Sequence, residues 1–199
     1  MRNIKKDVTM VTVLLATCVF SLCSISGTNE PVSANEHRSP HNIGSMVGVH
    51  IEPNKIVRAK DYPWRHEVQI ALPPSYHSSD KSYPVLWVVD GSIYFEPATN
   101  AVNFIINKHV PEMIVVAIGV PAEEASELAM RRLYDFSPFD NWVSKGFGDT
   151  LIPSSMKSWK GGGAEKFLSL LVDDLRSELS QQYRMASEGH TLFGNSAGG

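Results

Sequence analysis

The stretch of sequence that decides the fold is Thr191-Leu192-Phe193-Gly194-Asn195-Ser196-Ala197-Gly198-Gly199, the last nine of the 199 residues. It places the pattern G-x-S-x-G directly after a short run of strand-forming residues. A serine flanked in this way is typical of a sharp strand-to-helix turn that leaves its hydroxyl exposed. The backbone at such a serine is strained, and glycines two residues before and after it let the neighbouring chain pass without a Cβ clash. The pattern therefore predicts a nucleophilic serine at Ser196.

The chemistry of this serine depends on its surroundings. A serine hydroxyl is a weak nucleophile at neutral pH and needs a neighbouring base to remove its proton. The amide of the next residue, Ala197, is expected to point at the oxyanion that develops during acyl transfer. The same residues could also form an ordinary loop, so the interpretation rests on the elements that precede them.

A long amphipathic helix is predicted over residues 164–183, directly before this strand. Its apolar residues share one helical face and its charged residues lie away from it. The helix-strand order is the one that a parallel α/β sheet requires. A phosphate-binding loop at residues 161–166 is excluded because the G-K-[ST] ending is missing. The predicted apolar face comprises Phe167, Leu168, Leu171, Leu175 and Leu179.

The chain from residue 46 onward predicts a sheet. Residues 46–56 and 64–72 alternate between apolar and polar, which indicates antiparallel strands near a sheet edge. Residues 83–89 and 113–120 are apolar without alternation, as in strands that are covered on both faces. A helical segment over residues 98–107 would connect them. The expected fold class is α/β, with a mostly parallel sheet flanked by helices and antiparallel strands at its N-terminal edge.

Residues 123–160 are less regular, with prolines, glycines and several aromatic residues. We expect a long loop region, because structureless connections of this length are uncommon and usually line sites. The alternative is a surface excursion that is packed by its own aromatic side chains.

The composition is that of a soluble globular domain. Hydrophobic residues make up 43% of the sequence and the formal net charge is -3, which gives no indication of nucleic-acid binding. Both cysteines, Cys18 and Cys23, lie near the N-terminus, so the folded part has no disulfide framework. We expect no cofactor and no metal.

The N-terminus has the layout of a secretory signal. Basic residues precede an apolar stretch over residues 8–25, and small and polar residues follow it. Cleavage could fall near Gly27 or after Ala34. An uncleaved membrane anchor is the alternative, because the stretch approaches the roughly 18 to 20 residues that span a bilayer. A lipid anchor at Cys18 fits less well, because a threonine precedes the cysteine.

These features divide the chain into three parts. Residues 1–27 are expected to be a signal peptide or N-terminal anchor, residues 28–45 a polar linker, and residues 46–199 the folded domain. The domain is expected in the periplasm or outside the cell, in contact with a membrane only through an uncleaved N-terminal segment.

Four separated motifs, in this order, resemble the putative esterase family of α/β-hydrolases, which includes enterochelin and salmochelin esterases, S-formylglutathione hydrolase and the mycolyltransferases. The motifs lie at residues 72–76 (LPPSY), 83–91 (YPVLWVVDG), 162–167 (GGAEKF) and 191–199 (TLFGNSAGG). The resemblance implies an α/β-hydrolase fold, of which this chain holds the N-terminal portion.

By this resemblance Ser196 is the nucleophile, and the backbone amides of Ala197 and Ser92 form the oxyanion hole. Ser92 follows Asp90-Gly91, a pair that could also be a plain turn after a strand. Arg131 and Arg132 lie in a segment that looks like the family's Arg…Asp-x-Thr-Pro loop near the substrate. An arginine there could hold an anionic substrate, although a solvated surface charge is an equally good interpretation.

The chain departs from the family in its histidines. All seven precede Ser196, whereas the family's catalytic histidine follows the serine. His190 lies six residues upstream on the predicted strand, roughly 20 Å from the serine, so it cannot be the base. His66 and His109 are expected to be surface or loop residues. We therefore expect these 199 residues to be inactive alone, and their last strand, left at a sheet edge, to make them poorly soluble.

The predicted function is an exported serine carboxylic-ester hydrolase that acts through an acyl-serine intermediate on a small-molecule ester. Siderophore-type esters fit the export signal best. One alternative is an acyltransferase of the same fold, in which an alcohol replaces water. Another is a non-catalytic, truncated or degenerate product.

Overall fold

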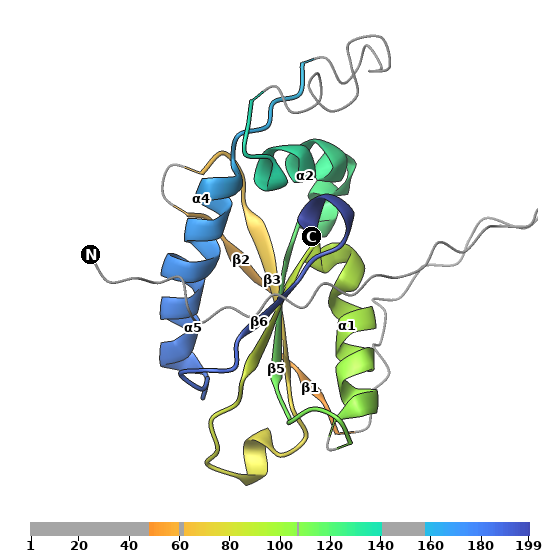
Figure 1. Cartoon of the computed structure of the whole chain (residues 1–199), viewed down its shortest axis with the longest axis vertical. Helices are drawn as coiled ribbons and strands as arrows, with labels where there is room; N and C mark the ends of the chain where they lie inside the picture. The colour runs from red at the N-terminus through yellow and green to blue at the C-terminus, as the bar shows by residue number, and fades with distance from the viewer. Residues whose placement is uncertain (1–47, 60–61, 107, 141–157) are drawn as a thin grey trace, which may run out of the picture.

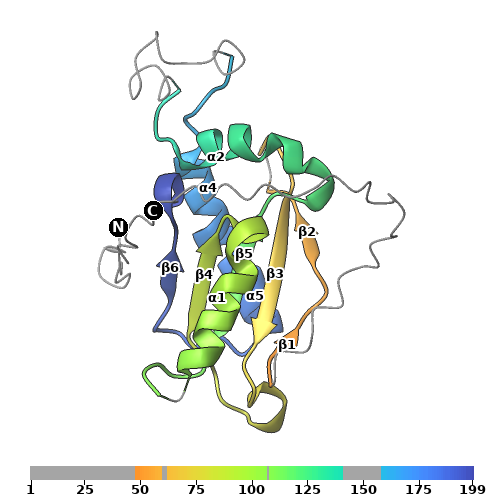
Figure 2. The same cartoon turned by 90° about the vertical axis from the view of Figure 1, so that its right-hand side faces the viewer.

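The computed structural model describes residues 48–59, 62–106, 108–140 and 158–199, so the predicted signal segment and linker lie outside the described residues. A mixed sheet forms the centre, with helices on both of its faces (Figures 1 and 2). Within the described ranges no helix is both long and apolar enough to cross a membrane. The strands are β1 (His50–Ile51), β2 (Lys55–Val57), β3 (His66–Leu72), β4 (Val85–Val89), β5 (Ile114–Gly119) and β6 (Thr191–Phe193).

The strand order is β1-β3-β5-β4-β6, and β2 pairs with β3 beside β1. β1 and β2 run antiparallel to β3, and β3 runs antiparallel to β5. β5, β4 and β6 are parallel neighbours. The prediction of antiparallel strands at the N-terminal edge of a parallel sheet is therefore confirmed. Because β4 and β6 are parallel, the chain leaves both strands at the same edge of the sheet.

The core has two layers because the sheet is covered on both faces. On β5, Ile114, Val116 and Ile118 join one apolar cluster, whereas Val115 and Ala117 join the other. Every residue of β5 is buried, which explains its uninterrupted apolar sequence. α1 (Gly91–Ile105) covers one face, and the helix that begins at α4 covers the other (Figure 1).

α1 begins at Gly91, earlier than the predicted start at residue 98. Asp90 precedes it in a left-handed conformation, with φ 56°. The carbonyl of Asp90 accepts hydrogen bonds from the N–H groups of Ile93 (2.8 Å) and Tyr94 (3.0 Å). The glycine at the start and Pro97 inside the helix weaken its sequence signal, and packing against β5 compensates for them.

The predicted helix over 164–183 is one continuous helix made of α4 (Ala164–Ser169), a π-helical turn η4 (Leu170–Leu175) and α5 (Arg176–Gln182). Four of the five residues predicted on its apolar face are buried, but Leu168 is 53% exposed. The π-helical turn η4 adds a residue to the turn that follows Leu168, so the buried face continues N-terminally through Leu170 and Phe167, and Leu168 points away from the sheet. Leu170 is buried instead.

The described first part of the region 123–160 is not the loop that we expected from its sequence. It forms a 3₁₀ segment η2 (Ala122–Glu127) and the helix α2 (Leu128–Phe136). Residues 141–157 lie outside the described residues. α2 lies across the end of the sheet where β4 and β5 finish (Figures 1 and 2).

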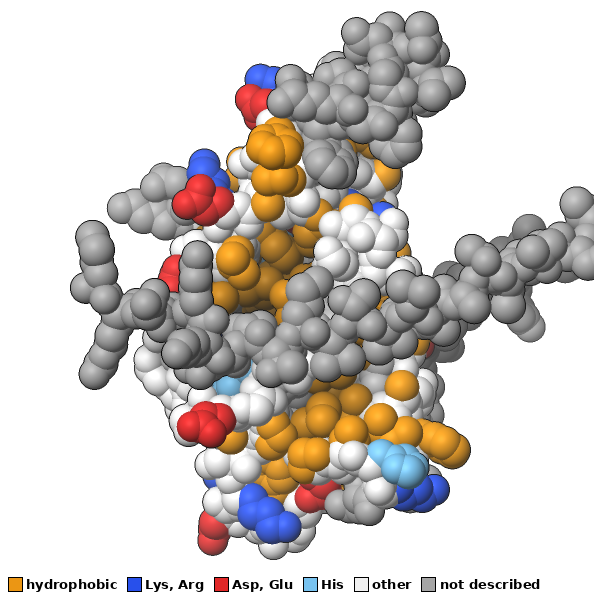
Figure 3. Space-filling view, in the orientation of Figure 1, with side chains coloured by type: hydrophobic (Ala, Val, Ile, Leu, Met, Phe, Trp, Pro, Cys, Tyr) orange, Lys and Arg blue, Asp and Glu red, His pale blue; other side chains and the backbone are white. Residues whose placement is uncertain are grey.

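β6 is the outermost strand of the described sheet on its side, and it pairs only with β4 there. The view onto β6 in Figure 3 shows hydrophobic side chains exposed over a large part of this face. This agrees with the expectation of an open strand edge. Poor solubility remains a prediction.

Candidate active site

Ser196 has the strained backbone that the G-x-S-x-G pattern predicts. Its φ is 58°, in the left-handed region that residues with a side chain rarely adopt. Two residues, Gly194 and Asn195, separate it from the end of β6, and it begins the short 3₁₀ turn η5 (Ser196–Gly198). The N–H of Gly198 donates to the carbonyl of Asn195 (3.1 Å), which closes the turn. The turn thus brings the serine abruptly out of the sheet.

Both glycines of the pattern are sterically required. A Cβ on Gly194 would lie 1.8 Å from the carbonyl oxygen of Gly198, because the turn folds back over it. A Cβ on Gly198 would lie 2.8 Å from Cγ2 of Val89, at the end of β4. These contacts are closer than any real Cβ contact, so neither position accepts alanine without displacing backbone or core.

The turn from β4 into α1 lies beside the serine turn. The register of the parallel strands pairs Val88 with Phe193, so both turns leave the sheet from adjacent positions. The side-chain amide Nδ2 of Asn195 donates to the hydroxyl of Tyr94 (2.6 Å) and ties the two turns together. Ser92 is the second residue of α1, where the N–H has no acceptor within the helix. The two amides predicted for the oxyanion hole are therefore carried on neighbouring turns.

The first turn of α1 is also held against the end of β5. A Cβ on Gly119 would lie 2.5 Å from the amide nitrogen of Ser92, and a Cβ on Gly91 would lie 3.0 Å from the amide nitrogen of Ile118. Glycines at these two positions let the helix start pack directly on the sheet. Gly91 is thus more than a plain turn residue.

Asp90 forms a buried ion pair beneath the serine turn. Its side chain is 2% exposed, and Oδ1 accepts a hydrogen bond from Nε of Arg132 (2.8 Å). Its other oxygen, Oδ2, has no partner within the described part of the chain and lies next to Gly198. Burial raises the pKa of Asp90, and the hydrogen bond from Arg132 opposes that rise. Arg132 itself is 27% exposed and lies over the ring of Phe136.

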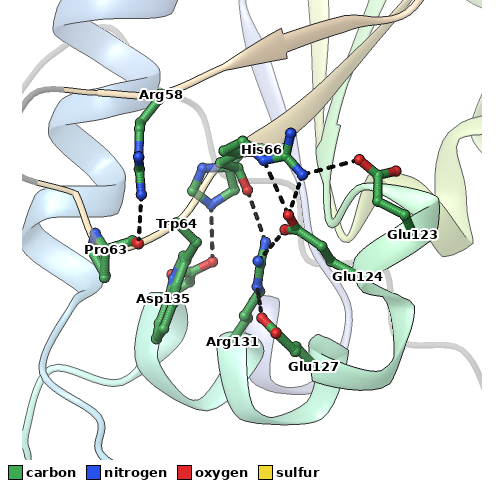
Figure 4. A network of polar contacts seen from close by, with 10 residues as sticks. Arg58, Pro63, Trp64, His66, Glu123, Glu124, Glu127, Arg131 and Asp135 are labelled. Atoms are coloured by element: carbon green, nitrogen blue, oxygen red, sulfur yellow. Dashed lines mark hydrogen bonds and ion pairs between the residues drawn. The ribbon is translucent and has the colours of Figure 1, made fainter.

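Arg131 connects α2 to β3 from inside the protein (Figure 4). Its side chain is 4% exposed. The guanidinium donates to the carbonyl of Arg65 (2.9 Å) and to Glu127 (3.0 Å), and it pairs with Glu124. Glu124 also pairs with Arg65, which lowers the pKa of its carboxyl. The interpretation of Arg131 as a solvated surface charge is wrong, and its contacts leave little capacity for an anionic substrate.

A second buried network surrounds Asp135 on α2 (Figure 4). Oδ1 accepts hydrogen bonds from the hydroxyl of Tyr62 (2.5 Å) and from Nε1 of Trp64 (3.2 Å), and Oδ2 lies 3.2 Å from Nε2 of His66. Burial and the neighbouring Asp135 raise the pKa of Tyr62 well above its usual value. The network fixes α2 to the start of β3. The sequence analysis missed it because its members come from distant segments.

The histidines lie away from Ser196. His66 is 2% exposed, so the expectation of a surface or loop residue is wrong. It lies on β3, three strands from β6, and strand spacing puts it about 14 Å from the serine turn. His190 accepts from Nε1 of Trp87 (3.1 Å) and donates to the carbonyl of Ala186 (2.8 Å), and burial lowers its pKa.

The other described histidines are at the opposite end of the sheet or on the surface. His50 pairs with Leu72 at the far end of β3, and His77 contacts it. His109 is exposed after α1, as expected. No histidine in the described ranges is placed to take a proton from Ser196. In the same ranges, no group of three or more His, Cys, Asp or Glu side chains could hold a metal ion.

The comparison with protein families decides the assignment. A family model described as "Putative esterase" matches residues 59–199, which is most of the chain. The chain belongs to this family. It is 28% identical over 133 residues to the ferri-bacillibactin esterase BesA of Bacillus subtilis (strain 168). The match covers 63% of this chain and 43% of that protein, so the chain spans less than half the length of this relative.

Solved structures agree with the family. The BES protein from Bacillus cereus superposes with a TM-score of 0.61 at 25% identity, over 76% of this chain and 55% of that chain. The siderophore hydrolase EstA from Aspergillus nidulans gives a TM-score of 0.57 at 25% identity, over 82% and 53% of the two chains. The predicted fold, the N-terminal portion of an α/β-hydrolase, is confirmed.

Proposed function

We propose that this family member is a serine carboxylic-ester hydrolase with Ser196 as its nucleophile. The observation that carries the proposal is the left-handed conformation of Ser196 between two glycines that have no room for a Cβ. The Oγ of Ser196 attacks the ester carbonyl carbon and gives its proton to a base. The tetrahedral intermediate then expels the alcohol, which takes up that proton, and leaves an acyl-serine. Water attacks the acyl-serine, and the acid is released.

The oxyanion of the intermediate would be stabilised by the amides of Ala197 and Ser92. Two preorganised N–H donors cost no reorganisation during the reaction, and removing one such donor typically slows turnover by about 100- to 1000-fold. The parallel register of β4 and β6 and the bond from Asn195 to Tyr94 support this role, because they hold the two turns together.

The base must be a residue outside the described part of the chain. The five described histidines are hydrogen-bonded elsewhere, lie at the far end of the sheet, or are several strands away. All seven histidines of the sequence also precede Ser196. In other hydrolases of this fold the catalytic histidine follows the serine in chain order, and we infer the same order for the base that serves Ser196. These residues alone are then expected to bind but not to turn over an ester.

Siderophore-type esters are the substrates that we propose. The support comes from the relatives, since BesA is called a ferri-bacillibactin esterase and EstA a siderophore hydrolase. Export is part of the same proposal and rests on the basic and apolar N-terminal sequence. If an alcohol replaced water as acceptor, the protein would be an acyltransferase. Competition between water and added alcohols during turnover distinguishes the two.

The decisive experiment compares the 199 residues with the longest product of the gene. Both are tested for p-nitrophenyl ester hydrolysis and for covalent labelling by a fluorophosphonate, with Ser196→Ala as the test variant. Ser180→Ala, on the exposed side of α5, is the matched control. We expect hydrolysis and labelling in the longer protein, both lost in Ser196→Ala and retained in the control. Labelling that survives Ser196→Ala would exclude Ser196 as the nucleophile.

A further inference from the structure

We propose that a pocket on the far side of α2 from Ser196 is a second ligand site, which binds a planar aromatic group that carries a negative charge. The pocket has a volume of about 450 Å³, within the range of small-molecule sites. Its aromatic lining residues are Tyr62, Trp64, Tyr134 and Trp159, and its basic ones are Lys160 and Lys166. The proposal does not depend on the function of Ser196.

The pocket is separate from the serine turn because α2 lies between them. Met130 and Tyr134, one helical turn apart on α2, line the pocket. Arg132 and Phe136 lie about 200° around the helix axis from these two residues. Arg132 contacts Asp90, and the ring of Phe136 faces Gly198. The pocket and the serine turn are therefore separated by one helix diameter, about 10 Å.

The aromatic walls are held rigidly. The ring of Tyr134 makes edge-to-face contacts with Tyr62 (6.1 Å between centroids) and Trp64 (5.2 Å). The polar atoms of Tyr62 and Trp64 both donate to the buried Asp135. With their polar atoms satisfied inside the protein, these two side chains present fixed apolar surfaces, which suit a flat aromatic ligand.

The basic side of the pocket is fixed by glycine. A Cβ on Gly163 would lie 2.2 Å from the ring of Tyr134, so the chain passes directly across that ring. The N–H of Gly163 also donates to the carbonyl of Tyr134 (2.9 Å). This contact brings Lys160 and Lys166, on either side of Gly163, to the pocket.

The charge of the pocket is unbalanced. None of its lining residues is acidic. Lys160 and Lys166 are exposed, and within the described ranges neither has a carboxylate within ion-pair distance, whereas Arg65, Arg131 and Arg132 are all paired. Asp135, behind the aromatic wall, already accepts hydrogen bonds from Tyr62 and Trp64. Two unpaired ammonium groups beside aromatic walls favour an aromatic carboxylate or phenolate over a neutral ring.

The test is calorimetric titration of the purified protein with three probes: 2-naphthoate, its neutral analogue 2-naphthamide, and cyclohexanecarboxylate as a non-aromatic anion. We expect 2-naphthoate to bind at least tenfold more tightly than either of the others. Lys160→Ala combined with Lys166→Ala should remove most of the preference for naphthoate over naphthamide. Lys108→Ala, an exposed lysine remote from the pocket, is the matched control and should leave it unchanged.

Trp159→Leu tests the aromatic wall and should weaken naphthoate and naphthamide binding together. Lys160 and Lys166 are exposed and unpaired, so the double lysine variant should keep the thermal melting midpoint of the parent protein. An unchanged midpoint separates lost binding from lost folding. Absence of naphthoate binding, equal affinity for naphthoate and naphthamide, or an unchanged preference in the double lysine variant would each overturn the proposal.

Discussion

Replacing Arg132 with leucine tests whether the buried carboxylate of Asp90 supports the turn beneath Ser196. The side chain of Asp90 is 2% exposed, and within the described residues its only ion-pair partner is the guanidinium of Arg132. Removing one member of a buried pair typically costs about 3–5 kcal/mol, since the remaining charge stays desolvated. Arg132 is 27% exposed, so we expect the lower end, about 3 kcal/mol of unfolding free energy at pH 8.

The loss should depend on pH in a defined direction. Burial already raises the pKa of Asp90, and Arg132 opposes that rise, so the variant should have a still higher folded-state value. Between the unfolded pKa, about 4, and that raised value, the folded state binds a proton that the unfolded state releases. The unfolding free energy therefore falls as the pH rises through this window. At pH 5 the carboxyl can protonate, and the cost of Arg132→Leu should be smaller than at pH 8.

Urea unfolding followed by tryptophan fluorescence at pH 5 and pH 8 measures this effect. Asp90→Asn in the Arg132→Leu background removes the unpaired charge and should recover most of the loss at pH 8. Arg58→Leu is the control, because Arg58 is exposed and, among the described residues, donates only to the carbonyl of Pro63 (3.2 Å). A cost that is equal at both pH values, or that Asp90→Asn does not relieve, would refute the electrostatic reasoning.

Three further predictions concern the serine turn, α2 and β6. Gly194→Ala should abolish labelling of Ser196 in the longer protein and cost about 1–3 kcal/mol, because its Cβ would meet the carbonyl of Gly198 at 1.8 Å; a fully labelled variant would contradict this. Asp135→Ala leaves the buried donors of Tyr62 and Trp64 without an acceptor and should lower the unfolding free energy by about 2–4 kcal/mol in urea titration, whereas a cost below about 1 kcal/mol would show that water replaces the carboxylate. His190 should titrate below its usual pKa of about 6.5 in NMR, because it is partly buried; since its folded value is depressed, the unfolding free energy should rise with pH through that window, and His190→Gln should remove the dependence.

The sequence determined those features whose physics is local. G-x-S-x-G after a strand-forming run predicted the turn at Ser196, because only glycine fits where a Cβ would meet the returning backbone. The unbroken apolar runs predicted β4 and β5, because a strand covered on both faces has no polar side. The alternation of apolar and polar residues predicted the antiparallel strands at the edge, because a strand with one face towards the solvent has one polar side. One helical face was also predicted correctly except at Leu168, which the π-helical turn η4 leaves off the buried face.

Tertiary structure alone decided which polar groups are buried and what they contact. His66 was expected at the surface, but Asp135, 69 residues away in sequence, pairs with it inside the protein. The sequence left Arg131 as either a substrate contact or a solvated surface charge, but its buried guanidinium contacts Glu124, Glu127 and the carbonyl of Arg65. A buried polar group is stable only beside a matching partner, and partners from distant segments leave no periodic signal in the sequence. For the same reason the aromatic pocket beside α2 could be found only once the fold had brought its walls together.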